Sequence, residues 1–246
     1  MTFTQIDPPR ATRHPARTRA ISCAPALLAL ALPMAQAQLV DGGFESNPLT
    51  TIAAVINTPF PMMFGMWGPE SATIVGTVGL VVPQAGLSML STTFTGGVTS
   101  QTVQAIDVTS LGSTITAGAN FTLSAYFNAL DSGPIGGIAM QFFSSNTYAT
   151  QIGVPVFGSI NVDGNPALWQ ILTISGLIPF GTQSMMAQVY YSNASLLGAN
   201  GALQPGYVDS VEFRITPVPE PSTWAMLAAG GLLIGWRARR PARHPG

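Results

Sequence analysis

Lysine is missing from this chain of 246 residues, and cysteine and histidine are scarce. The single cysteine is Cys23 and the two histidines are His14 and His244, so all three lie near the ends of the chain. Residues 38–216 therefore contain no lysine, histidine or cysteine. This composition excludes a disulfide, a Schiff-base lysine, a Ser-His-Asp triad and a zinc site built from histidine or cysteine in that stretch.

Positive charge is also nearly absent from the middle of the chain. Arg214 is the only basic residue between residues 38 and 216, against eight acidic residues, which gives the stretch a formal charge of −7. Proteins bind nucleic acids and anionic membrane surfaces through clusters of lysine and arginine. The sequence therefore predicts that nucleic acid is not a partner.

The N-terminal region has the pattern of a secretory signal peptide. Four arginines precede an apolar stretch over residues 21–34, and the A-x-A sequence Ala35-Gln36-Ala37 follows it. A basic segment, an apolar segment and a small-residue site in this order are read by the export machinery. We predict a signal peptide over residues 1–37, cut by signal peptidase before Gln38.

The C-terminal region has three parts. A polar motif over residues 218–223 is followed by an uncharged apolar stretch over 224–236 and a tail over 237–246 with Arg237, Arg239 and Arg240. A helix over 224–236 would be about 20 Å long, which is short for a permanent span of a bilayer core of about 30 Å. We expect a short hydrophobic helix that tethers the chain transiently to the inner membrane, with the basic tail in the cytoplasm. The alternative is a buried helix that ends a soluble domain, but the basic cluster and the terminal position argue against it.

This end of the chain resembles the PEP-CTERM sorting signal of Gram-negative bacteria. The similarity covers roughly 25 residues of the region 217–246: the motif, the glycine-rich apolar stretch and the arginines occur in the order typical of the signal. The motif residues are Val218, Pro219, Glu220, Pro221, Ser222 and Thr223. The resemblance implies processing by an exosortase, and then release or attachment at the cell surface, often alongside exopolysaccharide.

Residues 38–216 show the alternation of apolar and polar side chains that is typical of β-strands. Phe121, Leu123, Ala125 and Phe127 are separated by single, mostly polar residues, which is a period of two. Further strands are predicted over 102–108, 138–143, 169–174, 185–191 and 207–215. Turns are predicted over 133–137, between the first strand and a returning one, and over 110–113, after the strand over 102–108. No helical periodicity stands out. Many short strands with glycine and proline between them predict one antiparallel β-sandwich, a jelly roll, over residues 38–216.

Four short blocks of this region look like carbohydrate-binding jelly rolls of the galactose-binding-like type. They are residues 39–45, 84–90, 101–104 and 207–213, although Gln84-Ala85 stand where the family usually has an aspartate before the glycine. The resemblance implies that the first and last strands lie side by side and share a structural calcium ion. By position, Glu45 and Asp209 are the expected ligands and Asp41 is a weaker third, and carboxylates are ligands that calcium prefers.

The strand pattern bears separately on Asp209. Simple alternation puts Asp209 on the same face as Val211, Phe213 and Ile215, the apolar face, where a carboxylate needs a partner. The alternative is that Asp209 lies at the end of the strand, in solvent or bonded to amides of a turn.

The sequence favours a non-catalytic exported module that associates with exopolysaccharide or another carbohydrate. Sugar rings stack on exposed aromatic side chains, and Trp67, Trp169 and Tyr190 are candidates, although each would also suit the core. Two alternatives remain: a structural surface or biofilm protein without a specific ligand, and a glycoside hydrolase that uses two carboxylates. The acidic residues are scattered singly, so their spacing suggests no catalytic pair.

Overall fold

The computed structural model describes residues 39–46, 51–52, 64–69, 72–92, 94, 99–194, 196–197, 202–218, 226 and 228–232. These residues belong to one compact unit, Met34–Gly246. The predicted signal peptide, with Ala35, Ala37 and Gln38, lies outside the described residues, as do Pro219 to Thr223 and Arg237, Arg239 and Arg240.

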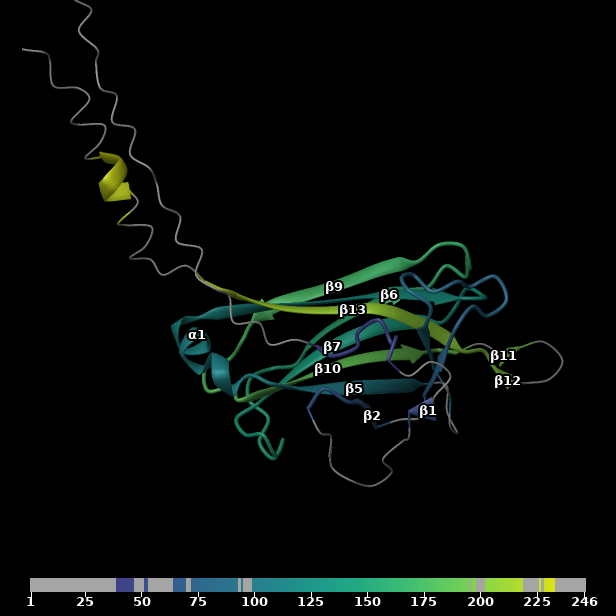
Figure 1. Ribbon diagram of the computed structural model, residues 1–246, viewed down its shortest axis with the longest axis horizontal. Coiled ribbons are helices and arrows are strands. Elements are labelled where there is room, and N and C mark those ends of the chain that lie inside the picture. Colours follow the sequence, from purple (N-terminus) through teal and green to yellow (C-terminus); the bar gives the residue numbers. More distant parts are fainter. Residues whose placement is uncertain are drawn as a thin grey trace, which may run out of the picture. The chain divides into compact units, whose positions relative to one another are not determined.

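The strands form two antiparallel sheets that face each other (Figure 1). Sheet A has the order β1-β3-β4-β13-β6-β9 and sheet B the order β2-β5-β10-β7-β8. The strands of sheet A are β1 Thr51–Ile52, β3 Ala72–Val75, β4 Met89–Thr92, β6 Ala119–Ala129, β9 Gln170–Leu177 and β13 Gly206–Pro217. The strands of sheet B are β2 Trp67–Pro69, β5 Ser100–Asp107, β7 Ile135–Phe143, β8 Val156–Asn161 and β10 Ser184–Ser192. A separate ribbon pairs β11 Leu196–Leu197 with β12 Ala202–Leu203. The predicted antiparallel β-sandwich is confirmed.

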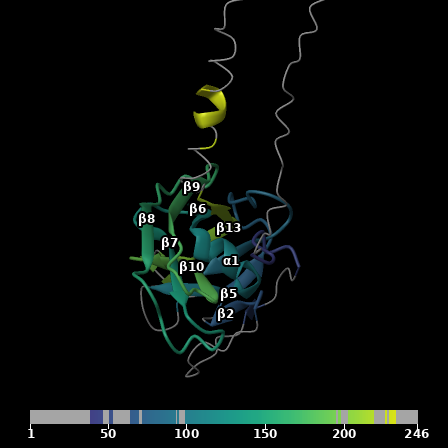
Figure 2. The same cartoon turned by 90° about the vertical axis from the view of Figure 1, so that its left-hand side faces the viewer.

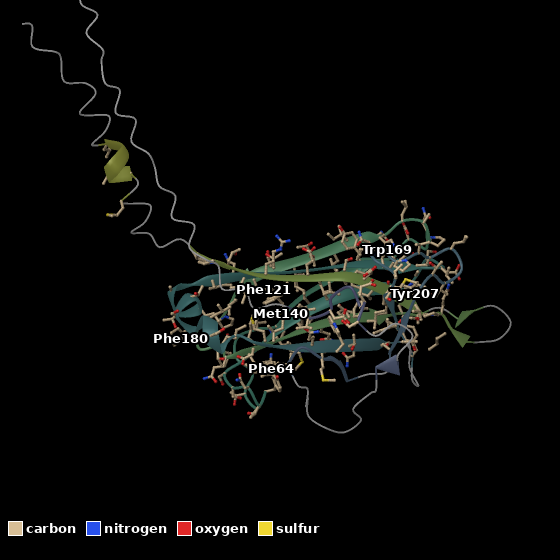
Figure 3. All side chains as sticks on the ribbon, viewed as in Figure 1. Phe64, Phe121, Met140, Trp169, Phe180 and Tyr207 are labelled. Carbon is tan, nitrogen blue, oxygen red and sulfur yellow. The ribbon has the colours of Figure 1, made fainter. Side chains whose placement is uncertain are left out.

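The core lies between the two sheets, as the alternation in β6 predicts. Phe121, Leu123 and Phe127 are fully buried, and Phe121 meets Phe142 of sheet B edge-on with ring centroids 5.5 Å apart. Figure 3 shows Phe121 and Met140 between the layers. Full burial of one such side chain stabilises the fold by roughly 1.5–3 kcal/mol, so this apolar stripe is what holds the sheets together.

Two local predictions are wrong. β7 does not return beside β6, because the turn before it carries the chain from sheet A to sheet B. The turn expected after β5 is instead a short helical segment, η1 Thr109–Leu111 followed by α1 Gly112–Ala117. Leu111 and Ile115 are buried and close one end of the sandwich. Two apolar residues at a spacing of four are too few to stand out as helical periodicity.

A β-bulge interrupts the alternation of β13. Its pairing with β6 shifts between Asp209 and Glu212, and Ser210 in the bulge has a φ of 49°. Val208 faces the core with Phe127, so Asp209, the next residue, points to the opposite side of the strand. The prediction that Asp209 lies on the apolar face is therefore wrong, because a bulge inserts one residue and reverses the alternation.

Loops cover part of the outer side of each sheet. On sheet A, Val81 packs with Met89, Tyr207 and Trp169, and the indole N–H of Trp169 donates to the carbonyl of Val82 at 2.9 Å. On sheet B, Val103, Phe143 and Met186 pack with Tyr148 of the following loop. The described loops leave the region of sheet B around Tyr190 open.

The predicted sorting helix over 224–236 is described only at Met226 and at 228–232, which are helical. Within the part of the chain that the structure describes, no helix is long and apolar enough to cross a membrane.

Candidate ligand-binding face

The open region of sheet B is formed by side chains that point away from the core. In β10, Met185, Ala187, Val189 and Tyr191 belong to the core, so Gln188 and Tyr190 face outward. Their neighbours across the sheet complete the surface. We call it the Tyr190 face and define it as Gln101, Gln141, Phe157, Ser159, Gln188 and Tyr190.

Tyr190 lies across the neighbouring strand and does not stand up from the sheet. A β-carbon at Gly137, the residue opposite it on β7, would overlap Cζ of the Tyr190 ring. The phenol oxygen lies 3.4 Å from the carbonyl oxygen of Gly158 on β8, one strand further on. The missing side chain at Gly137 thus lets the ring lie over the backbone, with its other side turned outward.

Polar amides and a second aromatic side chain surround this ring. Nε2 of Gln188 donates to Oε1 of Gln101, so the two amides are held in one orientation. Phe157 on β8 is 62 % exposed, and Ser159 lies opposite Gly137. The surface therefore combines aromatic rings with amide and hydroxyl groups, the side chains that bind sugar rings and their hydroxyls.

None of the six residues of the Tyr190 face is charged, and on the same side of β5 the acidic residue that the structure describes is Asp107. Its carboxylate accepts hydrogen bonds from N and Oγ1 of Thr109, at 2.9 and 2.7 Å. Burial, and then the Asp107 charge, raises the pKa of Tyr148, whose ring covers the end of this face. These groups make the surface neutral at one end and weakly acidic at the other.

The structure separates the three aromatic residues that the sequence singled out. Trp67 is only 8 % exposed, packs on Phe44 at 5.3 Å between ring centroids, and donates from its indole N–H to the carbonyl of Asp41. Trp169 fixes the loop over sheet A. Of the three, Tyr190 alone lies on the open face, so the structure does not bring them together into one site.

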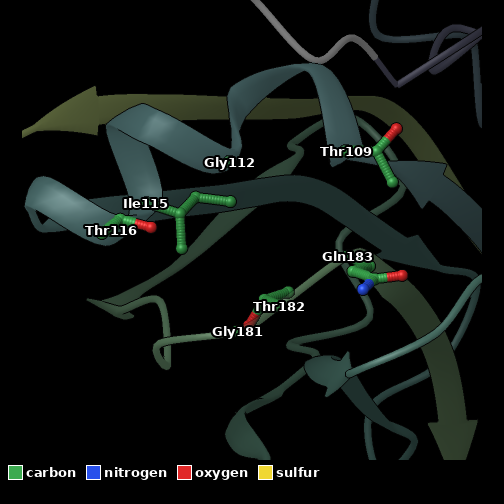
Figure 4. Close-up of a pocket in the computed structure, with 7 residues that line it drawn as sticks. All are labelled: Thr109, Gly112, Ile115, Thr116, Gly181, Thr182 and Gln183. Carbon is green, nitrogen blue, oxygen red and sulfur yellow. The ribbon is translucent and has the colours of Figure 1, made fainter.

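A pocket, separate from the Tyr190 face, lies at the end of the sandwich beside α1 (Figure 4). It has a volume of about 370 Å³ and is lined by Thr109, Gly112, Ile115, Thr116, Gly181, Thr182 and Gln183. The Thr182 hydroxyl donates a hydrogen bond to the carbonyl of Pro179 at 2.7 Å. Hydroxyls and one amide line this pocket, without an aromatic surface for stacking.

The predicted calcium ligands meet a loop of backbone amides. Asp209 Oδ2 accepts from the amides of Gln84 and Ala85, at 2.7 and 3.1 Å. The Glu45 carboxylate accepts hydrogen bonds from the amides of Leu87 and Ser88, and both nitrogens lie 3.0 Å from its Oε1. The loop over 84–88 therefore binds both carboxylates with its own N–H groups.

Asp209 is fully buried by this arrangement. Burial raises the pKa of the Asp209 carboxyl to about 6, and the nearby Glu45 charge adds to the rise. Hydrogen bonds from the amides of Ala85, Ser210 and Gln84 act in the opposite direction, because they favour the ionised form.

Asp41 does not join this pair. Its carboxylate accepts from the amides of Glu45 and Ser46 instead, at 2.7 and 3.2 Å. Among the described residues, no three acidic, histidine or cysteine side chains gather closely enough to hold a metal ion. The three expected ligands do not form one set, and calcium binding by Glu45 and Asp209 stays a prediction.

Residues 217–240 match the PEP-CTERM protein-sorting motif. The match spans the motif, the apolar stretch and the first arginines of the tail. It implies that the protein is exported to the cell surface and processed by an exosortase. No curated protein is similar in sequence to this chain.

The sandwich is similar to solved structures of distant sequence. The C-terminal family 22 carbohydrate-binding module of Clostridium thermocellum Xyn10B is 14% identical, with a TM-score of 0.45 over 76% of this chain and 100% of that one. The CBM22-1 xylan-binding domain of Paenibacillus barcinonensis Xyn10C is 12% identical, with a TM-score of 0.41 over 74% and 96%. The enzymatically active domain of tailspike protein 4 from bacteriophage CBA120 is 13% identical, with a TM-score of 0.40 over 61% of this chain and only 19% of that chain.

Sequence reasoning missed most of the Tyr190 face. Gln188 and Phe157 carry no motif, Gln101 was noted only as part of the block over 101–104, and sequence alone does not say which strands become neighbours. A signal was present in β10, where alternation places Gln188 and Tyr190 on the side opposite four core residues. The glycine pair at 136–137 was a second signal, because a bare stretch of strand permits a close approach.

Proposed function

We propose that this protein is an exported, non-catalytic module that binds neutral carbohydrate on the Tyr190 face. The observation that carries the proposal is the Tyr190 ring lying over Gly137, with the bonded pair Gln101 and Gln188 beside it. An aromatic ring with one side open gives a sugar ring an apolar surface to stack on. Amides beside it supply donors and acceptors for the hydroxyls.

The distribution of charged residues supports the proposal that the ligand is neutral. Arg214, the only basic residue among 38–216, lies on sheet A and pairs with Glu212 at 3.1 Å. Uronic-acid and sulfated polysaccharides are usually held by arginine or lysine, which this face lacks. The formal charge of −7 over the same stretch would also repel them.

The hydrogen bonding of the carboxylates supports a protein that binds carbohydrate without cleaving it. Glycoside hydrolysis needs two carboxyl groups that reach the scissile bond, one of them able to give a proton. Among the described carboxylates, Glu45 and Asp209 influence each other, and both are engaged by backbone amides, with Asp209 fully buried. Asp107 beside the Tyr190 face is engaged by Thr109.

Delivery to the surface is part of the same proposal. Signal peptidase would cut before Gln38, and the segment over 224–236 would hold the chain at the inner membrane until an exosortase acts on the motif at 218–223. The delivered sandwich would then lie where exopolysaccharide is its neighbour. Loss of cell-surface protein on changing Pro219-Glu220-Pro221 to alanines would support this route, and normal surface levels would contradict it.

Binding to a panel of polysaccharides tests the ligand class. The purified full chain is compared by affinity electrophoresis and calorimetry on neutral β-glucan, xylan and galactomannan, and on anionic alginate and pectate. We expect saturable binding to at least one neutral polymer and none to the anionic ones. Tyr190→Ala should weaken that binding by about tenfold or more, because it removes the stacking surface.

Tyr126→Ala is the matched control. Tyr126 is also a half-buried tyrosine in mid-strand, but it lies on the outer side of sheet A. This variant should keep the affinity of the unmodified chain. Equal losses in both variants, or no binding to any neutral polymer, would contradict the proposal and favour a structural surface protein without a specific ligand.

A further inference from the structure

Strand β9 is a long edge without the usual protection. Among the described strands, it ends the order of sheet A and pairs on one side only, with β6. Natural edge strands are kept from pairing by shortness, charged residues, proline or bulges. β1, with two residues, and β2, with three including Pro69, follow this rule. β8, which ends sheet B, does not, since it has six residues without charge or proline. β9 has eight residues, with no charge, no proline and no register shift.

The outward side of β9 is partly apolar. Ile171 is 53 % exposed and Leu177 is 64 % exposed, and the outward residues between them are Thr173 and Ser175. Figure 2 shows β8 and β9 along one side of the sandwich, where the two strands pack against each other. Exposed apolar residues on an unpaired edge indicate a surface that another strand can cover.

We infer that β9 pairs antiparallel with β9 of a second copy of this chain, about a two-fold axis at Ile174. In that register Ile171 lies opposite Leu177 of the other copy, and Thr173 lies opposite Ser175. Apolar residues thus face apolar ones and hydroxyls face hydroxyls. Sheet A would continue from one copy into the other.

The neighbouring registers match less well. A two-fold axis at Thr173 would set Ile171 against Ser175, and an axis at Ser175 would set Thr173 against Leu177. On β8, the other long edge, axes at Gly158 or Ser159 would set Phe157 against Ser159 or Asn161. Self-complementarity is therefore a property of β9 in one register, which favours a copy of the same strand as its occupant.

Charge also favours a second copy at this edge. Two copies that each carry −7 over residues 38–216 repel each other over most of their surface. Residues 164–208 contain no charged side chain, so the repulsion is weakest where β9 meets β9. A basic partner would instead be drawn to the acidic parts of the domain.

The inference is independent of the proposed ligand. Pairing through β9 would join two Tyr190 faces in one particle, and two linked sites bind a repetitive polymer more tightly than one.

A charge-swap series tests the pairing and its register. Sedimentation velocity of the purified full chain over a concentration series should show a monomer–dimer equilibrium. In the double variant Thr173→Lys/Ser175→Lys, lysines would lie opposite lysines twice across the axis. Association should weaken about tenfold or more, because like charges directly opposite each other across two strands are destabilising. In Thr173→Lys/Ser175→Glu, each lysine would lie opposite a glutamate, and association should return.

Thr122→Lys/Ser124→Lys is the matched control. These residues lie beside Ser175 and Thr173 on the same side of sheet A, but on the interior strand β6. The control adds the same charge and should leave the association constant unchanged, with melting temperatures confirming that all variants fold. A chain that stays monomeric, a Lys/Lys variant that dimerises normally, or a Lys/Glu variant that fails to recover would each overturn the inference. Any of these results would leave glycan binding by Tyr190 untouched.

Discussion

Gly137 determines how the Tyr190 ring lies on the sheet. With any larger residue at 137, the ring would have to rise from the sheet, since a β-carbon there would overlap it. With glycine, the tyrosine spans from β10 over β7 to the carbonyl of Gly158 on β8. Stacking on the outer side of such a ring loses little conformational entropy, because the ring is already positioned before a ligand arrives.

Asp209 shows how a buried carboxylate is tolerated in a domain almost without basic residues. Three backbone amides, those of Gln84, Ala85 and Ser210, donate to it. They replace the water that burial removes, but not enough to cancel the desolvation, so the pKa of Asp209 still rises to about 6.

Stability should therefore depend on pH through Asp209. The folded-state pKa of about 6 is above the ordinary value of 3.8, so protonation favours the folded state. This contribution is complete below about pH 4 and is lost as the pH rises through 6, which lowers the free energy of unfolding by up to about 3 kcal/mol. Denaturant unfolding at a series of pH values should show this fall in the unmodified chain and a flatter profile in Asp209→Asn. Identical profiles would contradict the assignment.

The same profile tests the predicted calcium ion. Calcium held by Glu45 and Asp209 would favour their ionised forms and would remove or reverse the fall in stability between pH 4 and 7. The measurement is repeated with calcium and with EGTA. Equal profiles in the two solutions would count against calcium at this loop.

The longest strands were predictable, whereas β8, the short strands and the arrangement of all of them were not. Period-two alternation located β5, β6, β9, β10 and β13, because burial on one side of a sheet imposes it directly. The assignment of β7 to the other sheet and the bulge after Asp209 depend on contacts between distant segments, which local pattern does not contain. The same limit applies to the site: Tyr190 was a candidate, but its partners from β5, β7 and β8 become neighbours only in the folded sheet.

The segment over 39–45 was expected to be the first strand from its resemblance to the jelly rolls, and it is instead irregular. It still lies beside β13, where the amide of Val211 donates to the carbonyl of Gly42 at 2.8 Å. On the other side of this segment, the buried side chain of Gln104 forms the hydrogen bonds that a neighbouring strand would otherwise form. The amide of Gln104 donates to the carbonyl of Val40 and accepts from its N–H, both at 2.7 Å.

Gln104→Leu should loosen this segment. The substitution leaves the backbone groups of Val40 without their partner, which should lower the free energy of unfolding by about 1–2 kcal/mol and speed hydrogen exchange at the Val40 amide. Gln141→Leu, on the outward side of the same sheet, should change stability by less than about 0.5 kcal/mol. Unchanged exchange at Val40 in Gln104→Leu would contradict this role.

Over the whole molecule, most positive charges lie in the two predicted terminal signals and most negative charges in the sandwich. Eight of the nine arginines lie in the two predicted delivery signals, and the sandwich between them carries −7. A domain of this charge repels anionic polymers and membranes, and we therefore expect a neutral ligand. The open face of sheet B, free of charge and furnished with Tyr190, Phe157 and glutamines, fits that requirement.

Hydroxyl-radical footprinting tests the location of glycan binding most directly. The full chain is oxidised with and without a saturating neutral polysaccharide from the binding panel, and modified residues are quantified by mass spectrometry. Tyr190 and Phe157 should become protected, while Tyr126 on sheet A and Phe180 next to the α1 pocket should keep their rates. Protection at Phe180 or Tyr126 with Tyr190 unchanged would contradict the assignment of the ligand to the Tyr190 face.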